Sequence, residues 1–242
     1  MTDHPDSPVV VTGAGGRAGR AVVAEAIRRG VRVVAVVRDP ARAADLHRDG
    51  VRVVAGNALV PARLTPAALH LRPASPPRAW VTAITPFSTP PDDFEGFDSS
   101  FYRRAHRAAL EAARRTGTGR LVVVGLFATL THRGRPVLDD PSLFPPRLRP
   151  FARAHAAGLE TLRDEAGDID WLTLAPPPLL SDSAPVTGAY RLGDGTLDPR
   201  AGSALSYTDL AVAVLDEIEK PTRHREQVAI YPADQDRAQD LP

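Results

Sequence analysis

Cysteine is absent from this chain of 242 residues, which excludes disulfide bonds, thiolate metal sites and a cysteine nucleophile. Neither sign of charge predominates, because 30 Lys and Arg face 29 Asp and Glu, so composition gives no case for binding nucleic acid or an acidic membrane surface. No apolar run is long enough to span a membrane, and the first eight residues lack the apolar segment of a signal peptide. These absences fit a cytoplasmic protein. They leave its oligomeric state open.

The sequence does contain a glycine-rich turn between a strand and a helix. An apolar run at Val9–Thr12 precedes the turn, a helical pattern follows it, and a second strand is expected at Val31–Val37. We expect Gly13 to permit the turn, Gly16 to let the backbone approach a pyrophosphate, and Gly19 to let helix and strand pack closely. The free N–H groups at the helix start would face the phosphates. This context predicts dinucleotide binding, with a purely structural loop as the alternative. The predicted contacts are Gly13, Gly15, Gly16, Arg17, Ala18 and Gly19.

The end of the second strand indicates which dinucleotide is bound. Arg38 follows the strand, and an arginine there suits the 2′-phosphate of NADP, with Arg17 as possible help. A solvated, helix-capping Arg38 is the alternative, and Asp39 turned inward would serve NAD instead. The sequence therefore favours NADP(H) over NAD(H). Asn57 follows the third strand and is a candidate acceptor for the adenine amino group, or equally a turn residue.

Apolar strands alternate with helical stretches, which is typical of a parallel sheet covered on both faces. We expect an α/β fold of Rossmann type, a doubly wound and mainly parallel sheet with a small C-terminal region that covers the substrate. A single domain would span residues 9–231 between flexible tails at 1–8 and 232–242. Short helices are predicted over Ala41–Asp49 and from Thr65. A later helix should begin at Ser206, with Asp209 completing a capping box.

Ligands of doubly wound sheets bind beyond the carboxyl ends of the strands. This rule adds four candidate cofactor contacts at those ends: Thr82, Ile84, Gly125 and Pro176. The substrate region should lie mainly in residues 126–150 and 176–205. Five side chains there and nearby would form an apolar pocket suited to a flat aromatic ligand, although core packing is the commoner fate of such residues: Phe87, Leu126, Phe127, Phe144 and Leu179. The histidines lack metal-ligand spacing, so no metal site is predicted.

Several motifs in the second half resemble those of a known family. They are Asp139–Pro145, Gly188–Arg191, Ser206–Ala211 and Asp216–Pro221, together with Pro145–Leu148, Leu162-Arg163, Pro176-Pro177 and Thr187–Tyr190. The chain resembles the atypical short-chain dehydrogenase/reductases, a group of NAD(P)H-binding proteins that includes NADH-flavin reductase-like, biliverdin reductase B-like and NmrA-like members. The resemblance covers nearly the whole chain from Val9 to Tyr231. It implies a nicotinamide cofactor and hydride transfer.

The chain departs from the better-known short-chain dehydrogenases at the catalytic pair. Those enzymes use a tyrosine acid and a lysine four residues later, whereas the corresponding helix here carries Phe151 and His155. The serine usual after the fifth strand is replaced by Leu126, which also removes the proton relay implied by biliverdin reductase B. His155, Tyr190 and Thr129 remain as candidate proton donors, His155 because an imidazole suits general acid work near neutral pH. Structural roles for His155 and Tyr190 are the alternatives.

A flat conjugated acceptor needs little help from such a donor, because its reduced form is a stabilised anion and orientation over the nicotinamide supplies most of the catalysis. The sequence thus predicts an NADPH-dependent reductase of a flavin, a quinone or an aromatic natural-product intermediate. Two alternatives stay open. One is a non-enzymatic NADP-binding sensor of the NmrA-like type, and the other is a non-redox isomerase, cyclase or dehydratase on the same scaffold.

Overall fold

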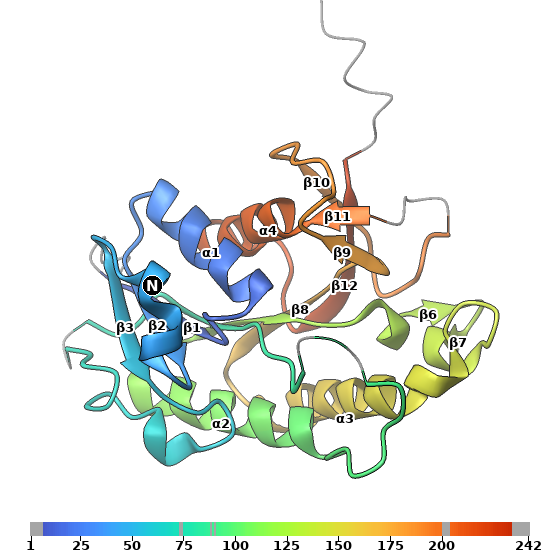
Figure 1. The fold of residues 1–242 in the computed structure, drawn as a ribbon, viewed down its shortest axis with the longest axis horizontal. Coiled ribbons are helices and arrows are strands. Elements are labelled where there is room, and N and C mark those ends of the chain that lie inside the picture. Colours follow the sequence, from blue (N-terminus) through green and yellow to red (C-terminus); the bar gives the residue numbers. More distant parts are fainter. Residues whose placement is uncertain (1–6, 73–74, 88, 90, 200–203, 234–242) are drawn as a thin grey trace, which may run out of the picture.

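An eight-stranded sheet organises the chain (Figure 1). The computed structural model describes residues 7–72, 75–87, 89, 91–199 and 204–233. The strand order is β10-β12-β8-β5-β4-β1-β2-β3, and all pairs are parallel except β10 with β12 at one edge. This order confirms the Rossmann-type, doubly wound α/β fold. The strands are β1 Val9–Thr12, β2 Val33–Val37, β3 Val51–Ala55, β4 Ala79–Thr82, β5 Arg120–Val124, β8 Asp170–Ala175, β10 Tyr190–Leu192 and β12 Glu226–Pro232.

Two helices cover each face of the sheet (Figure 1). Helices α1 (Arg17–Arg28) and α4 (Tyr207–Glu219) lie side by side on one face, and α2 (Phe101–Thr116) and α3 (Arg149–Glu165) on the other. Every residue of β1 and β2 is buried, as expected for strands covered on both sides, and this explains why both are rich in valine and lack polar–apolar alternation. The two apolar layers hold all eight strands in one plane, so the carboxyl ends of the parallel strands meet at one edge.

The carboxyl edge carries the irregular parts of the chain. Strands β9 (Leu179–Ser181) and β11 (Ala204–Ser206) form a small parallel pair, and β6 (Thr131–His132) and β7 (Arg135–Pro136) form a hairpin. The remaining short elements are 3₁₀ turns: η1 Pro40–Leu46, η2 Pro61–Arg63, η3 Phe127–Thr129, η4 Val137–Asp139 and η5 Pro146–Leu148. Among the described residues, no helix is both long and apolar enough to cross a membrane.

The two predicted short helices differ in outcome. The first is present only as the 3₁₀ helix η1, Pro40–Leu46, which is kinked at Ala43 and ends before the predicted Asp49, whereas the second is absent. After Thr65 the chain makes turns rather than a helix, although the Thr65 hydroxyl does accept the Ala68 N–H at 3.2 Å. His70 adopts a left-handed φ of 51° and ends the turn at once. The helix that Ser206 should begin is confirmed, and its hydroxyl accepts the Asp209 N–H at 2.9 Å.

The predicted tail boundaries need correction at both ends. Ser7 is buried with its hydroxyl 3.1 Å from that of Ser75, and the Pro8 carbonyl accepts the Arg78 N–H at 2.9 Å. At the other end Pro232 closes β12. The rest of the predicted tails, residues 1–6 and 234–242, lies outside the described residues, as do 200–203 of the predicted substrate region.

Candidate functional site

The glycine turn between β1 and α1 contains two glycines that the fold itself requires. Gly13 has φ +80°, and a Cβ there would lie 2.1 Å from the Ala83 carbonyl oxygen. A Cβ on Gly19 would lie 2.1 Å from the Gly13 carbonyl oxygen, so α1 could not pack against the turn. Gly16 is different, because the nearest atom to its Cβ would be the Gly13 oxygen at 3.4 Å. A side chain at Gly16 would therefore meet only ordinary contacts, unlike one at Gly13 or Gly19.

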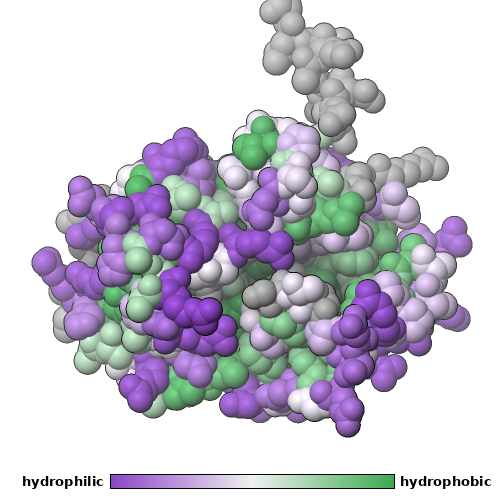
Figure 2. All heavy atoms as spheres, in the orientation of Figure 1, coloured by the Kyte–Doolittle hydropathy of each residue, from purple (hydrophilic) through white to green (hydrophobic). Residues whose placement is uncertain are grey.

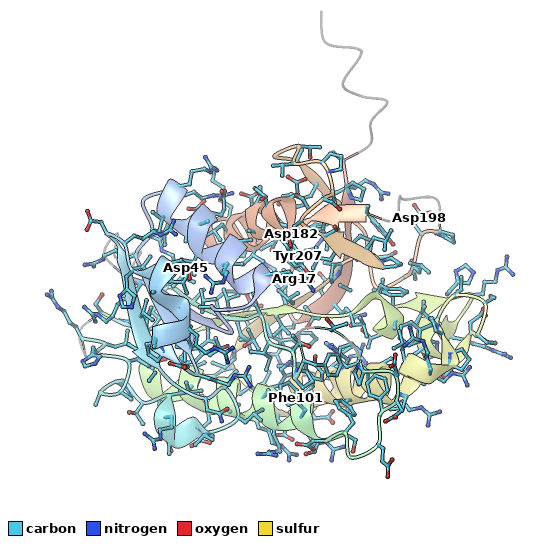
Figure 3. The ribbon with its side chains drawn as sticks, in the orientation of Figure 1. Arg17, Asp45, Phe101, Asp182, Asp198 and Tyr207 are labelled. Carbon is cyan, nitrogen blue, oxygen red and sulfur yellow. The ribbon has the colours of Figure 1, made fainter. Side chains whose placement is uncertain are left out.

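The start of α1 is built to receive an anion. Gly16 is its N-cap and provides no side-chain acceptor, and the first turn contains no acidic residue. The first N–H groups of a helix have no intrahelical partner, and the helix dipole is positive there. The Arg17 guanidinium adds a full charge in this turn and lies 5.3 Å from the centre of the Tyr207 ring, at the start of α4. Figure 3 shows Arg17, Tyr207 and Asp182 together beside this helix end. The free N–H groups and the Arg17 guanidinium suit the pyrophosphate of a dinucleotide, whereas the Asp182 carboxylate adds a negative charge near them.

The other predicted cofactor contacts lie at the same edge of the sheet. Thr82 pairs with Thr12 across β4 and β1, and the Ile84 Cγ2 atom lies 2.9 Å from the Cβ position of Gly13. Gly125 follows β5 and donates its N–H to the Leu174 carbonyl at 2.7 Å. Leu174 lies on the neighbouring strand β8, and Pro176 follows that strand. A Cβ on Gly125 would lie 2.5 Å from Thr173 Cγ2, so this glycine is required by packing. Ala18 is half-buried and packs against the core.

Two polar side chains near the predicted adenosine end are engaged in local turns. The Asp39 carboxylate accepts the Ala41 N–H at 3.0 Å and caps η1. The Asn57 side-chain oxygen accepts the Leu59 N–H at 2.9 Å, which favours the turn role over an adenine contact. Arg38 is exposed and has no ion-pair partner in the part of the chain that the structure describes. Of these three side chains, Arg38 alone is uncommitted.

A cluster of aromatic rings lies on the other side of this edge, against the start of α3. The Phe87 ring lies 5.0 Å from that of Phe151, and the Phe94 ring lies 5.3 Å from Phe97 and 6.4 Å from Phe151. All four rings are only half-buried. Beneath them the Tyr102 ring is 5.8 Å from Phe151 and almost fully buried. We call Phe87, Phe94, Phe97 and Phe151 the aromatic cluster. Figure 2 shows a hollow between the two halves of this face, with apolar surface along part of its rim.

His155 lies behind the aromatic cluster. Its ring stacks on that of Tyr102 with centroids 3.6 Å apart, and it is 4.7 Å from Phe151. Burial, with a smaller contribution from His106, lowers the pKa of His155 well below its ordinary value. The side chain is 8% exposed. It is therefore neutral near pH 7 and packed as part of the interior, which favours its structural role over that of a proton donor.

Tyr190 and Thr129 are both held by other groups. The Tyr190 hydroxyl donates to Asp216 at 2.8 Å, and Asp216 also binds Arg29 at 2.7 Å. Arg29 follows the last residue of α1, about 18 Å along a 12-residue helix from the glycine turn, so Tyr190 is wrongly placed for a proton donor there. The Thr129 hydroxyl is 2.7 Å from the Leu126 carbonyl and 2.8 Å from Gln227 Oε1. The expectation that Tyr190 acts at the cofactor is not supported.

The predicted apolar pocket is only partly brought together. Phe127 and Phe144 are 8% and 3% exposed and pack on each other at 5.6 Å in the core, so their assignment as pocket residues is wrong. Leu126 is half-buried against the same core. Leu179 is 57% exposed on β9. Phe87 alone of the five joins the aromatic cluster, because side-chain direction in a loop is set by tertiary packing.

The sequence analysis missed Phe94, Phe97 and Tyr207. A signal for the first two was present: Phe87, Phe94, Phe97 and Phe101 crowd into 15 positions of a chain that has only 7 phenylalanines. Tyr207 carried no signal, because only the parallel packing of α1 and α4 brings it to Arg17.

One cavity lies away from this edge. It has a volume of about 270 Å³ and is lined by Arg32, Arg52 and Arg72 near the amino ends of β2 and β3. The glycine turn follows the carboxyl end of β1, so this cavity is separate from the proposed cofactor site. Within the described residues, no group of three or more histidines and carboxylates is arranged to hold a metal ion.

Comparison with known proteins agrees with this geometry. The model of the NAD(P)H-binding family matches residues 13–221. The chain belongs to this NAD(P)H-binding family. Protein YwnB of Bacillus subtilis, itself uncharacterised, is 27% identical over 226 residues, which cover 91% of this chain and 96% of YwnB.

Two solved structures show the same fold as this NAD(P)H-binding protein. A candidate NADH-flavin reductase from Streptococcus pneumoniae is 23% identical with a TM-score of 0.74, over 93% of this chain and 99% of its own. ChuY, an anaerobillin reductase from Escherichia coli O157:H7, is 20% identical with a TM-score of 0.64, over 94% and 98%. At 23% and 20% identity, the similarity to these two structures shows a shared fold alone.

Proposed function

We propose that this protein is an NADPH-dependent reductase that transfers hydride to a flat conjugated acceptor: a flavin, a quinone or an aromatic natural-product intermediate. The observation that carries the proposal is the half-buried aromatic cluster, which stands where a short-chain dehydrogenase would place its tyrosine and lysine. Phe151 and His155 occupy those two positions, and neither supplies a proton readily. The names of the two solved relatives, a flavin reductase and an anaerobillin reductase, agree with such an acceptor.

The choice of NADPH is supported by the side chains at the end of β2. One oxygen of the Asp39 carboxylate caps η1, which makes this side chain less available to the ribose of NAD. Arg38 remains available for a 2′-phosphate. A charge-assisted hydrogen bond contributes about 1.5–3 kcal/mol, enough for roughly tenfold to a hundredfold preference.

The protein's contribution would be binding, orientation and exclusion of water. Bound NADPH supplies the hydride. The α1 N–H groups and Arg17 would hold the pyrophosphate, and the aromatic cluster would stack on a flat acceptor and orient it for hydride transfer. Offset aromatic stacking contributes about 0.5–1.5 kcal/mol per ring pair, which is sufficient to orient a flat molecule. The reduced acceptor, a stabilised anion, then takes its proton from water.

The proposal is tested by the rate at which NADPH absorbance is lost in the presence of a panel of flavins, quinones and aromatic ketones. Protein-dependent oxidation is expected with at least one class. The double variant Phe94→Leu/Phe97→Leu should lower kcat/KM for the acceptor and leave the Kd for NADPH unchanged. The matched variant Phe144→Leu removes a core ring and should not alter acceptor preference.

A sensor of the NmrA-like type is the second candidate, favoured by the same loss of a proton donor. It predicts NADPH binding without oxidation by any acceptor. Conversion of a substrate without net NADPH oxidation would instead indicate a non-redox enzyme.

A further inference from the structure

The segment that carries Phe94 and Phe97 is strongly acidic. Residues 91–98 contain two phenylalanines and four carboxylates, with no basic residue: Asp92, Asp93, Glu95 and Asp98. All four carboxylates are exposed. The aromatic cluster is therefore bordered by negative charge on the side of this segment.

Only one of these charges is compensated in the described part of the chain. Asp98 pairs with Arg104 at 3.0 Å and accepts the Ser100 hydroxyl at 2.6 Å and the Ser100 N–H at 2.9 Å. The hydroxyl bond, with a smaller contribution from the N–H bond, lowers the pKa of Asp98. Asp93 accepts the Glu95 N–H at 3.0 Å within a turn and has no cationic partner there. Asp92, Asp93 and Glu95 thus remain as three uncompensated charges.

These charges are close to the rings by covalent geometry. Asp93 and Glu95 are the chain neighbours of Phe94, and consecutive Cα atoms are about 3.8 Å apart. Their carboxylates lie within roughly 8 Å of the Phe94 Cα atom and so border any ligand stacked on that ring. The exposed Arg153 lies two positions from Phe151, about 200° round α3, and so projects from the opposite side of that helix.

We infer that the acceptor site selects uncharged or cationic flat ring systems and disfavours phosphorylated or dicarboxylate ones. The inference rests on the proposed function, since it assigns the substrate class of the same site. Arg17 and Arg38 lie at the predicted dinucleotide end, whereas residues 91–98 at the acceptor end contain no basic residue. Riboflavin would be preferred to FMN, which carries the same ring system with an added phosphate.

The size of the preference follows from Coulomb's law in water. Three carboxylates about 10 Å from a dianionic phosphate disfavour it by roughly fivefold at 0.1 M salt. Screening at 1 M salt, where the Debye length is about 3 Å, removes nearly all of this effect. The preference should therefore be salt-dependent, unlike one caused by shape.

Quenching of flavin fluorescence measures binding of riboflavin and FMN to the NADP⁺-loaded protein, and NADPH oxidation measures turnover in parallel. We expect wild-type protein to bind riboflavin about fivefold more tightly than FMN at 0.1 M salt. The variant Asp93→Asn/Glu95→Gln should reduce this ratio below twofold. The control Asp164→Asn/Asp168→Asn changes net charge equally near the far end of α3, about 20 Å from Phe151, and should keep the ratio.

Three results would overturn the inference. Wild-type protein binds FMN as tightly as riboflavin, Asp93→Asn/Glu95→Gln leaves the affinity ratio unchanged, or neither flavin binds. A riboflavin preference in binding with no NADPH oxidation would support the acidic border and refute the reductase instead.

Discussion

Alanine at Gly16 and at Gly19 should separate ligand binding from folding within one turn. A Cβ on Gly19 would lie 2.1 Å from the Gly13 oxygen and 2.7 Å from the Ala14 Cα atom, so the helix must move. Gly16 has φ −82° and ψ 169°, which any residue adopts, and its nearest neighbour lies at 3.4 Å. The methyl group of Gly16→Ala therefore extends toward the space that the pyrophosphate would occupy.

Gly19→Ala should lower the free energy of unfolding, whereas Gly16→Ala should mainly weaken NADPH binding. Glycine to alanine inside a helix normally gains about 0.5–1 kcal/mol, whereas an overlap of this kind costs about 1–3 kcal/mol or more. Gly19→Ala should thus lose about 1–2 kcal/mol, which lowers Tm by roughly 2–8 °C for a chain of this size. For Gly16→Ala, the poorer N-cap and the less flexible unfolded chain nearly cancel. Loss of one charge-assisted contact should weaken NADPH binding by roughly tenfold to a hundredfold.

Thermal unfolding without cofactor measures the change in Tm, and titration of NADPH fluorescence measures the Kd for NADPH. Gly119→Ala is the matched control, since its Cβ would have no neighbour within 4 Å. The reasoning is refuted if Gly19→Ala is as stable as Gly119→Ala, or if Gly16→Ala binds NADPH with the wild-type Kd.

Three further results are expected. Arg38→Ala should weaken NADPH binding roughly tenfold to a hundredfold and leave NADH nearly unaffected in parallel titrations; equal losses would remove it from the 2′-phosphate site. Burial lowers the pKa of His106 from about 6.5 to about 4. Between these two pH values the unfolded state therefore binds more protons at this residue than the folded state does, and stability falls as the pH falls. Urea unfolding should then show a loss of about 2 kcal/mol from this group between pH 7 and pH 5, and equal stability at both would contradict its burial. Tyr190→Phe should leave NADPH oxidation unchanged and cost about 1 kcal/mol of stability through the lost bond to Asp216; slower turnover would restore Tyr190 as a donor.

The sequence predicted those features that depend on neighbouring residues. Strand β1, the glycine turn and α1 follow one another within 20 residues, and the constraint on Gly19 comes from Gly13 and Ala14 in the same turn. The constraint on Gly13 also involves Ala83 after β4, which only the pairing of β1 with β4 brings close. The apolar strands with intervening helices likewise predicted the parallel sheet. Short helices were predicted less well, because the propensity after Thr65 was not matched by an apolar face long enough to pack.

The acceptor side of the site could not be predicted in the same way. Phe87, Phe94 and Phe97 follow β4, whereas Phe151 begins α3 more than 50 positions later, and only the packing of α3 beside α2 brings the rings together. Phe127 and Phe144 are instead buried in a separate apolar cluster, although nothing in their local sequence distinguishes them from the half-buried phenylalanines. Local spacing thus determined the cofactor turn. Long-range packing decided which aromatic rings face the acceptor, because a loop side chain has no periodicity that fixes its direction.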